Sequence, residues 1–238
     1  MKNILIICIL VLLFSNKASG QDFNTIIKEV IAHNNKDTYH YNLHYKVFRG
    51  EKGQKVYEDY KGVMALKEGN FYQKIDVMET LQTSTFIVKL NHNDKQIRID
   101  RGDALTPVNT LSLDLSTIDK LFDKGTVEDL GSVYKLELLS KKTSGSQYSK
   151  VFVHIDKQTK KMIKQVMFLR QLQDFSSSNT FPSNDQYDIA RLEISIIDIN
   201  DDIARKDELF KQERYFTIVN NKIKLGNEFK NFELVPTY

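Results

Sequence analysis

The strongest constraint on the fold is a hydrophobic period of two that begins near residue 39. From Tyr39 to Val47, every second residue is aromatic or apolar, which places these side chains on one face of a β-strand. Similar short stretches with turn residues between them continue to Asp198, and they predict antiparallel strands joined by tight turns. The predicted strands are Lys55–Lys67, Phe71–Glu79, Thr83–Leu90, Gln96–Asp100, Ser132–Leu139, Lys150–Asp156, Met162–Leu172 and Tyr187–Asp198, with two more near Tyr215–Val219 and Phe232–Val235.

Three segments interrupt this pattern with helical spacing. Apolar residues recur at the helical period in Phe23–Ile31, where Asp22 is placed to cap the helix, and in Leu115–Phe122, where Gly125 is placed to end it. A short helix is predicted at Ile203–Phe210. The predicted class is therefore α+β: a curved antiparallel sheet, an incomplete barrel, with a few helices on its concave face.

The first twenty residues have the pattern of a secretory signal peptide. Lys2 supplies the positive start, Ile4–Phe14 is apolar, and Ala18-Ser19-Gly20 offers small residues for cleavage before Gln21. The apolar stretch is shorter than the roughly 20 residues that span a bilayer. We therefore expect residues 1–20 to be removed and residues 21–238 to form one domain, located in the periplasm or beyond it and not spanning a membrane.

Composition excludes several classes of function. The single cysteine, Cys8, lies in the predicted signal peptide, so the mature chain would have no disulfide and no thiol chemistry. The whole chain carries 34 basic and 31 acidic residues, and cleavage would remove Lys2 and Lys17, which leaves a nearly neutral protein. A chain with this balance predicts no nucleic-acid partner.

Residues 151–170 form a predicted hairpin that is apolar on both faces. Val151, Val153 and Ile155 share one face, whereas Phe152 lies on the other with His154 and Asp156. In the second strand, simple alternation groups Met162 with Val166 and Phe168. An antiparallel sheet that faces water keeps one face polar, so both faces here must be covered. Either a helix and a neighbouring loop or sheet cover them, or one face borders a cavity with room for an apolar guest.

The arrangement resembles the periplasmic lipoprotein carriers, the LolA/LolB-like family. The resemblance lies in the signal peptide, the first helix and three stretches, which are "YKGVMALKEGNFYQKI" (60–75), "FIVKLNHNDKQIRID" (86–100) and "VFVHIDKQTKKMIKQVMFL" (151–169). It spans most of residues 22–200, and the part beyond Asn200 has no counterpart in that family. The resemblance implies an incomplete antiparallel barrel with helices as a lid over an apolar cavity for acyl chains.

On this hypothesis, a set of apolar side chains would line the cavity. The tyrosines of the first strand could instead cover an ordinary core with their hydroxyls at a wet rim. Which face of the hairpin points inward depends on the strand register, because a shift of one residue exchanges the two faces. The candidate lipid-binding residues are Tyr41, Tyr45, Phe86, Val88, Leu90, Val153, Val166 and Phe168.

Metal sites are not predicted. His40 and His44 lie four residues apart on a strand, which separates them by about 13 Å, too far to share one zinc ion. These histidines are expected at the surface. Asp198, Asn200 and Asp202 imitate the start of a calcium loop, but the sixth and twelfth positions of that loop are isoleucine and leucine instead of glycine and glutamate.

Catalytic motifs are also missing from the sequence. No serine sits in a Gly-x-Ser-x-Gly elbow, and no glycine-rich phosphate loop is present. The predicted function is therefore a non-catalytic, cofactor-free binding protein of the cell envelope that carries or senses an acyl chain, a lipid or a lipoprotein. The alternative is a periplasmic protein–protein interaction module without lipid cargo, whose partner is another envelope protein.

Overall fold

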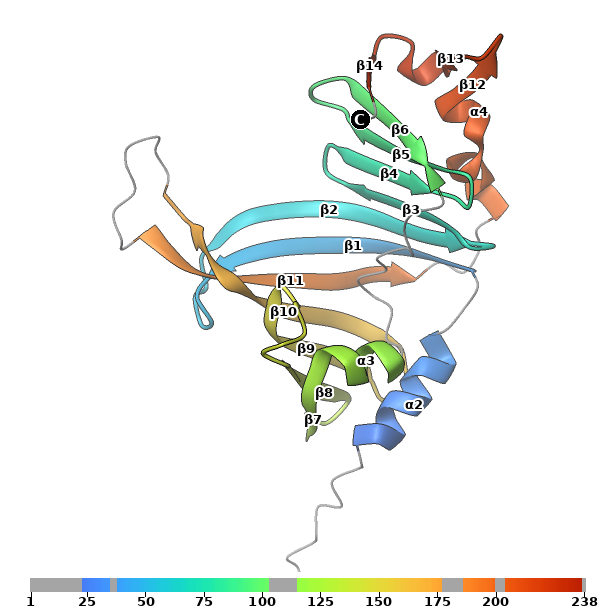
Figure 1. Ribbon diagram of the computed structural model, residues 1–238. Coiled ribbons are helices and arrows are strands. Elements are labelled where there is room, and N and C mark those ends of the chain that lie inside the picture. The colour runs from blue at the N-terminus through green and yellow to red at the C-terminus, as the bar shows by residue number, and fades with distance from the viewer. Residues whose placement is uncertain (1–22, 35–37, 103–114, 177–185, 200–203, 237–238) are drawn as a thin grey trace, which may run out of the picture.

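The computed structural model describes residues 23–34, 38–102, 115–176, 186–199 and 204–236 (Figure 1). The predicted signal peptide and the Asp22 cap lie outside these residues. The strands are β1 (Thr38–Arg49), β2 (Val56–Lys67), β3 (Asn70–Ile75), β4 (Met78–Gln82), β5 (Phe86–Asn91), β6 (Gln96–Arg101), β7 (Phe122–Asp129), β8 (Val133–Ser140), β9 (Tyr148–Asp156), β10 (Met162–Asp174), β11 (Tyr187–Ile199), β12 (Phe216–Val219), β13 (Lys222–Leu225) and β14 (Glu233–Val235).

Twelve of these strands form one open sheet in the order β14-β6-β5-β4-β3-β2-β1-β11-β10-β9-β8-β7, and β12 pairs with β13 in a separate hairpin. Neighbours in the large sheet are antiparallel except for the short pair β14 and β6, which is parallel. The predicted mainly antiparallel sheet is confirmed. The two edge strands do not pair with each other, so the sheet is not closed into a barrel.

The helices of the described residues are short. They are α2 (Phe23–Asn34), α3 (Leu115–Leu121), the 3₁₀ helix η3 (Ala204–Phe210), α4 (Gln212–Tyr215) and the 3₁₀ helix η4 (Asn227–Phe229). Figure 1 shows α2 and α3 beside the β7–β9 end of the sheet, whereas α4 and β12 lie at the β4–β6 end.

Several local predictions were wrong. The predicted strand Phe71–Glu79 is split into β3 and β4 by a tight turn in which Asp76 has a φ of 50°. Gly125 does not end α3, because the chain passes directly from Leu121 into β7 and Gly125 lies within that strand. A Cβ at this glycine would lie 2.2 Å from the Phe23 ring of α2, so any side chain here would require that ring to move. Tyr215 belongs to α4, and neither β7 nor β13 was predicted.

The sheet register defines two faces with different covers. Face 1 carries Tyr39, Tyr41 and Leu43 of β1, and face 2 carries His40, Asn42 and His44. On face 1, Ile27 of α2 and Ile118 of α3 pack into one core with the tyrosines and with strands β8–β11. The two helices therefore share one face of the sheet, as the sequence predicts.

Face 2 holds a second core at the other end of the sheet. There the C-terminal segment 204–232 covers strands β2–β6, and Tyr215, Phe216 and Phe229 are buried against Val88 and other apolar residues of the sheet. A sheet that is covered on face 1 at one end and on face 2 at the other was not predicted. The different covers reflect the sequence of each half of the sheet. The apolar core side chains lie on face 1 at the β7–β11 end, whereas at the β5–β6 end face 1 carries Lys89 and Arg98 and the apolar core side chains lie on face 2.

Candidate functional site

The main pocket lies where two ladders of the sheet are interrupted. A bulge between β1 and β2 leaves Tyr57 without a partner on β1. Between β10 and β11, three residues after Phe168 oppose the single residue Ala190. The Arg170 Nη2 in this bulge donates to the Lys141 carbonyl over 2.8 Å. Bulges bend strands and redirect side chains, so these two irregularities open face 1 beyond the end of its core.

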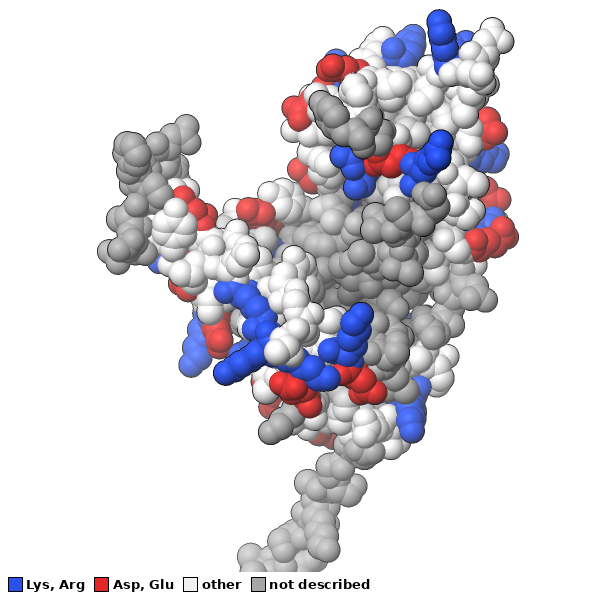
Figure 2. Space-filling model, in the orientation of Figure 1, with Lys and Arg blue, Asp and Glu red and all other residues white. Residues whose placement is uncertain are grey.

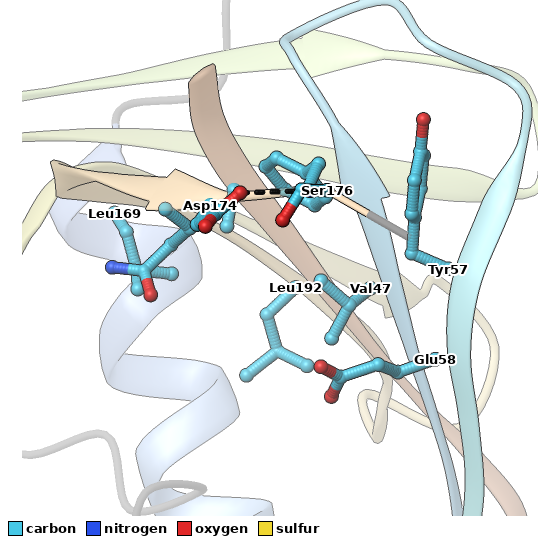
Figure 3. Close-up of a pocket in the computed structure, with 10 residues that line it drawn as sticks. Val47, Tyr57, Glu58, Leu169, Asp174, Ser176 and Leu192 are labelled. Atoms are coloured by element: carbon cyan, nitrogen blue, oxygen red, sulfur yellow. Dashed lines mark hydrogen bonds between the residues drawn. The ribbon is translucent and has the colours of Figure 1, made fainter. Parts of the chain in front are cut away.

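The pocket has a volume of about 400 Å³ and a mainly apolar wall. Val47 and Leu192 are directly opposed on β1 and β11, and both lie on face 1 beside the packed core. Tyr57 contacts the ring of Phe175 with 4.8 Å between centroids, which places an aromatic pair at one side. The lining residues are Val47, Tyr57, Glu58, Leu169, Gln173, Asp174, Phe175, Ser176, Ala190 and Leu192 (Figure 3).

The polar part of the lining is acidic. Figure 3 shows Glu58 reaching toward the same space as Val47 and Leu192. The Asp174 carboxylate accepts a hydrogen bond of 2.7 Å from the Ser176 backbone N–H. Two carboxylates beside an apolar wall favour a guest whose polar end is neutral or positive, because a second anion would be repelled.

A second hollow lies further along face 1. It has a volume of about 350 Å³ and is bordered by Tyr60, Ile75 and Met78, among others. Tyr60 lies on β2 two residues from Glu58, so the two hollows are neighbours along the same strand. Apolar surface on face 1 therefore continues past the part that α2 and α3 cover.

The eight candidate lipid-binding residues fall into three places. Tyr41, Tyr45 and Val153 belong to the core on face 1. The β5 residues Phe86, Val88 and Leu90 lie on face 2 under the C-terminal segment. Val166 and Phe168 also lie on face 2, but at the β9–β11 end. None of the eight lines the main pocket, and their role as cavity lining stays a prediction.

The hairpin that is apolar on both faces has a different cover on each side. Its face 1 residues pack in the core under α2, and a bulge puts Met162 there too, because the extra residue shifts the alternation. On face 2, the Phe152 and Phe168 rings meet edge to face at 5.3 Å. The Lys150 Nζ lies 4.4 Å from the Phe168 centroid, so charged side chains cover these rings. Among the described residues, no helix packs on this part of face 2.

Tyr45 carries a pH dependence that can be measured. Burial raises the pKa of its hydroxyl to about 12, although a hydrogen bond from Gln73 acts in the opposite direction. The unfolded chain would lose this proton near pH 10 and the folded chain would not. The free energy of unfolding should therefore fall above pH 10, by about 1.4 kcal/mol per pH unit from this residue. Urea unfolding of Tyr45→Phe between pH 9 and 12 should show a shallower fall than wild type, and equal slopes would contradict the assignment.

The histidines do not form a metal site in the part of the chain that the structure describes. His44 pairs with Asp59, with 2.5 Å between Nε2 and Oδ1. His40 was expected at the surface but is fully buried on face 2, where it lies opposite Ala65 of β2. The calcium-loop residues Asn200 and Asp202 lie outside the described residues. No described helix is long and apolar enough to cross a membrane.

Comparison with solved structures finds remote similarities. A putative outer membrane lipoprotein-sorting protein domain from Vibrio parahaemolyticus is 14% identical over 79% of this chain and 97% of its own, with a TM-score of 0.36. A LolA superfamily protein from Nitrosomonas europaea is 11% identical over 76% and 96%, with a TM-score of 0.30. The chain is remotely similar in structure to LolA-like proteins.

LprF from Mycobacterium bovis is 9% identical over 74% of this chain and 91% of its own, with a TM-score of 0.35. No protein-family model and no curated protein matches the sequence. These similarities are remote, and what the pocket can bind follows from its own residues.

The pocket residues were not predicted from the sequence. Val47 and Leu192 both continue apolar stripes that the alternation indicates, so their shared face could have been inferred. Leu169 and Ala190 reach the pocket only through the bulge in β10, and no residue type in that stretch signals it. The β12–β13 hairpin did have a signal, because Asn220-Asn221 between two short alternating stretches is typical of a two-residue turn.

Proposed function

We propose that the protein is a non-catalytic binding protein of the cell envelope that takes an acyl chain, free or attached to a partner, into the main pocket. The observation that carries this proposal is the apolar wall of Val47, Leu169 and Leu192 at the open end of the face 1 core. A volume of about 400 Å³ lies within the usual range of ligand pockets. Each buried methylene contributes about 0.8 kcal/mol, so a short stretch of chain supplies useful affinity.

The acidic lining narrows the class of guest. Glu58 and Asp174 belong to the lining, so the polar end of a bound chain would meet their carboxylates. An acyl chain linked through an amide, as in a lipidated peptide, brings no negative charge to that place. A free fatty acid does, so we expect an amide-linked chain to bind more tightly than a carboxylate of equal length.

Filling the pocket tests the proposal. Ala190 is buried at the pocket wall, and Ala190→Phe should occupy much of the space without adding charge. An acyl amide that carries a fluorophore should bind wild type. Its affinity should fall about tenfold or more in the variant, which corresponds to a loss of about 1.4 kcal/mol in binding free energy. Fluorescence titration measures both. Leu172→Phe, at an exposed position of β10, is the matched control and should bind as wild type.

Two outcomes would end the proposal. The first is a wild-type protein that takes up no acyl amide at all. The second is a folded Ala190→Phe variant with undiminished affinity, since the guest would then occupy another part of the molecule.

A further inference from the structure

The β12–β13 hairpin ends in a tight, well-defined tip. Val219 and Lys222 are opposed, and the two residues between them, Asn220 and Asn221, have φ values of 52° and 59°. Positive φ at both central residues is typical of the type I′ turn, whose twist matches that of the flanking strands. Asparagine adopts this conformation more readily than other non-glycine residues. The tip is therefore a compact turn rather than an extended loop.

One face of this hairpin is apolar from its base to its tip. At the base, Phe216 is buried and meets the Phe86 ring of the sheet at 5.3 Å. On the same face, Ile218 stands opposite Ile223, but these side chains are 63% and 41% exposed. Val219, which lies on the other face opposite Lys222, is also exposed at the turn, by 52%. The apolar face thus continues past the core into solvent.

The base of the hairpin is held firmly. The Gly226 N–H donates to the Tyr215 carbonyl over 2.8 Å, and a Cβ at Gly226 would lie 2.0 Å from the Arg214 carbonyl oxygen. The Arg214 guanidinium in turn pairs with Glu228 at 2.9 Å. The exposed aliphatic side chains are therefore presented by an anchored element, and Figure 1 shows that element at the far end of the molecule from α2.

Charge indicates what this tip meets. Lys222 and Lys224 lie on β13, and no acidic residue occurs between Phe216 and Leu225. Figure 2 shows Lys and Arg side chains at this end of the molecule, with Asp and Glu side chains nearby. Tip-to-tip association of two copies would bring like charges together, which disfavours a second copy as the partner. Ile223 lies between Lys222 and Lys224 in β13, so the lysines project from the other face of the same hairpin tip. Exposed aliphatic side chains with lysines beside them suit an anionic lipid surface, where apolar groups insert and ammonium groups meet headgroups.

We propose that the tip of the β12–β13 hairpin, formed by Ile218, Val219, Lys222, Ile223 and Lys224, is a docking element for an anionic membrane surface. This goes beyond the acyl-binding pocket, which lies on face 1 near Val47 of β1 and contains no residue of the hairpin. The tip would bind the surface reversibly, because a few aliphatic side chains insert only to the level of the headgroups.

Vesicle co-sedimentation tests the proposal. The full chain is expressed and purified in the same way for every variant, so that any processing of its N-terminus is common to all. Wild type should bind vesicles of phosphatidylcholine with phosphatidylglycerol more strongly than vesicles of phosphatidylcholine alone. Ile218→Ser with Ile223→Ser should weaken binding about tenfold or more. Lys222→Glu with Lys224→Glu should remove the preference for the anionic vesicles.

The matched control is Leu172→Ser with Ile197→Ser, which replaces two aliphatic side chains that are each 59% exposed elsewhere on the sheet. This pair should leave vesicle binding unchanged. Wild type that does not bind anionic vesicles, or a folded Ile218→Ser/Ile223→Ser variant that binds as well as wild type, would overturn the proposal. A dimer that forms without lipid and is lost in that variant would overturn it too, because the tip would then be a protein interface.

Discussion

Arg214→Met is expected to lower the free energy of unfolding by about 3–5 kcal/mol. Glu79 of β4 is fully buried, and its carboxylate is paired by the Arg214 Nη1 at 2.8 Å and the His92 Nε2 at 2.8 Å. The Tyr215 hydroxyl also donates to Glu79 over 3.2 Å. Removing the guanidinium leaves a carboxylate in a low-dielectric core without its permanent positive partner, which is the costly way to break a buried pair. Urea unfolding measures the change.

Two further variants separate this effect from simple loss of contacts. Glu228→Gln removes the exposed partner of Arg214 and should cost no more than about 1 kcal/mol. Glu79→Gln combined with Arg214→Met removes both buried charges and should recover most of the loss. A loss for Arg214→Met as small as that for Glu228→Gln would contradict this role.

Phe168→Ala is expected to cost about 3–5 kcal/mol while leaving the binding of an acyl amide unchanged. The Phe168 ring is buried on face 2 between Phe152 and the Lys150 side chain, whereas the main pocket lies on face 1. Its removal creates a cavity under charged side chains that cannot move into an apolar space. Urea unfolding and fluorescence titration on the same protein give the two values.

Its neighbour in the chain is the natural control. Leu169 lines the pocket on face 1 (Figure 3). Leu169→Ala should weaken binding of the acyl amide by about fivefold or more, because it removes apolar wall, and should cost less stability than Phe168→Ala. If Phe168→Ala weakens binding and Leu169→Ala does not, the acyl chain lies on face 2 and the proposed pocket is wrong.

The sequence by itself determined most of the secondary structure. The alternation in Tyr39–Val47 predicts β1, and the helical spacing of Phe23–Ile31 predicts α2 on one face of the sheet. These features are readable because they depend on neighbours within a few residues: a strand buries alternate side chains, and a helix buries every third or fourth. The mainly antiparallel sheet follows from the same local turns.

The tertiary structure alone decided which face of each strand is covered, and by what. A bulge adds one residue, reverses the alternation beyond it and moves side chains such as Met162 to the other face. The bulges near Tyr57 and Leu169 open the pocket, and nothing in their residue types announces them. Covering also comes from distant segments: Tyr215 buries Val88 from more than a hundred residues away, and Lys150 covers Phe168 across a strand pair. Such partners are chosen by three-dimensional packing, which a local pattern cannot encode.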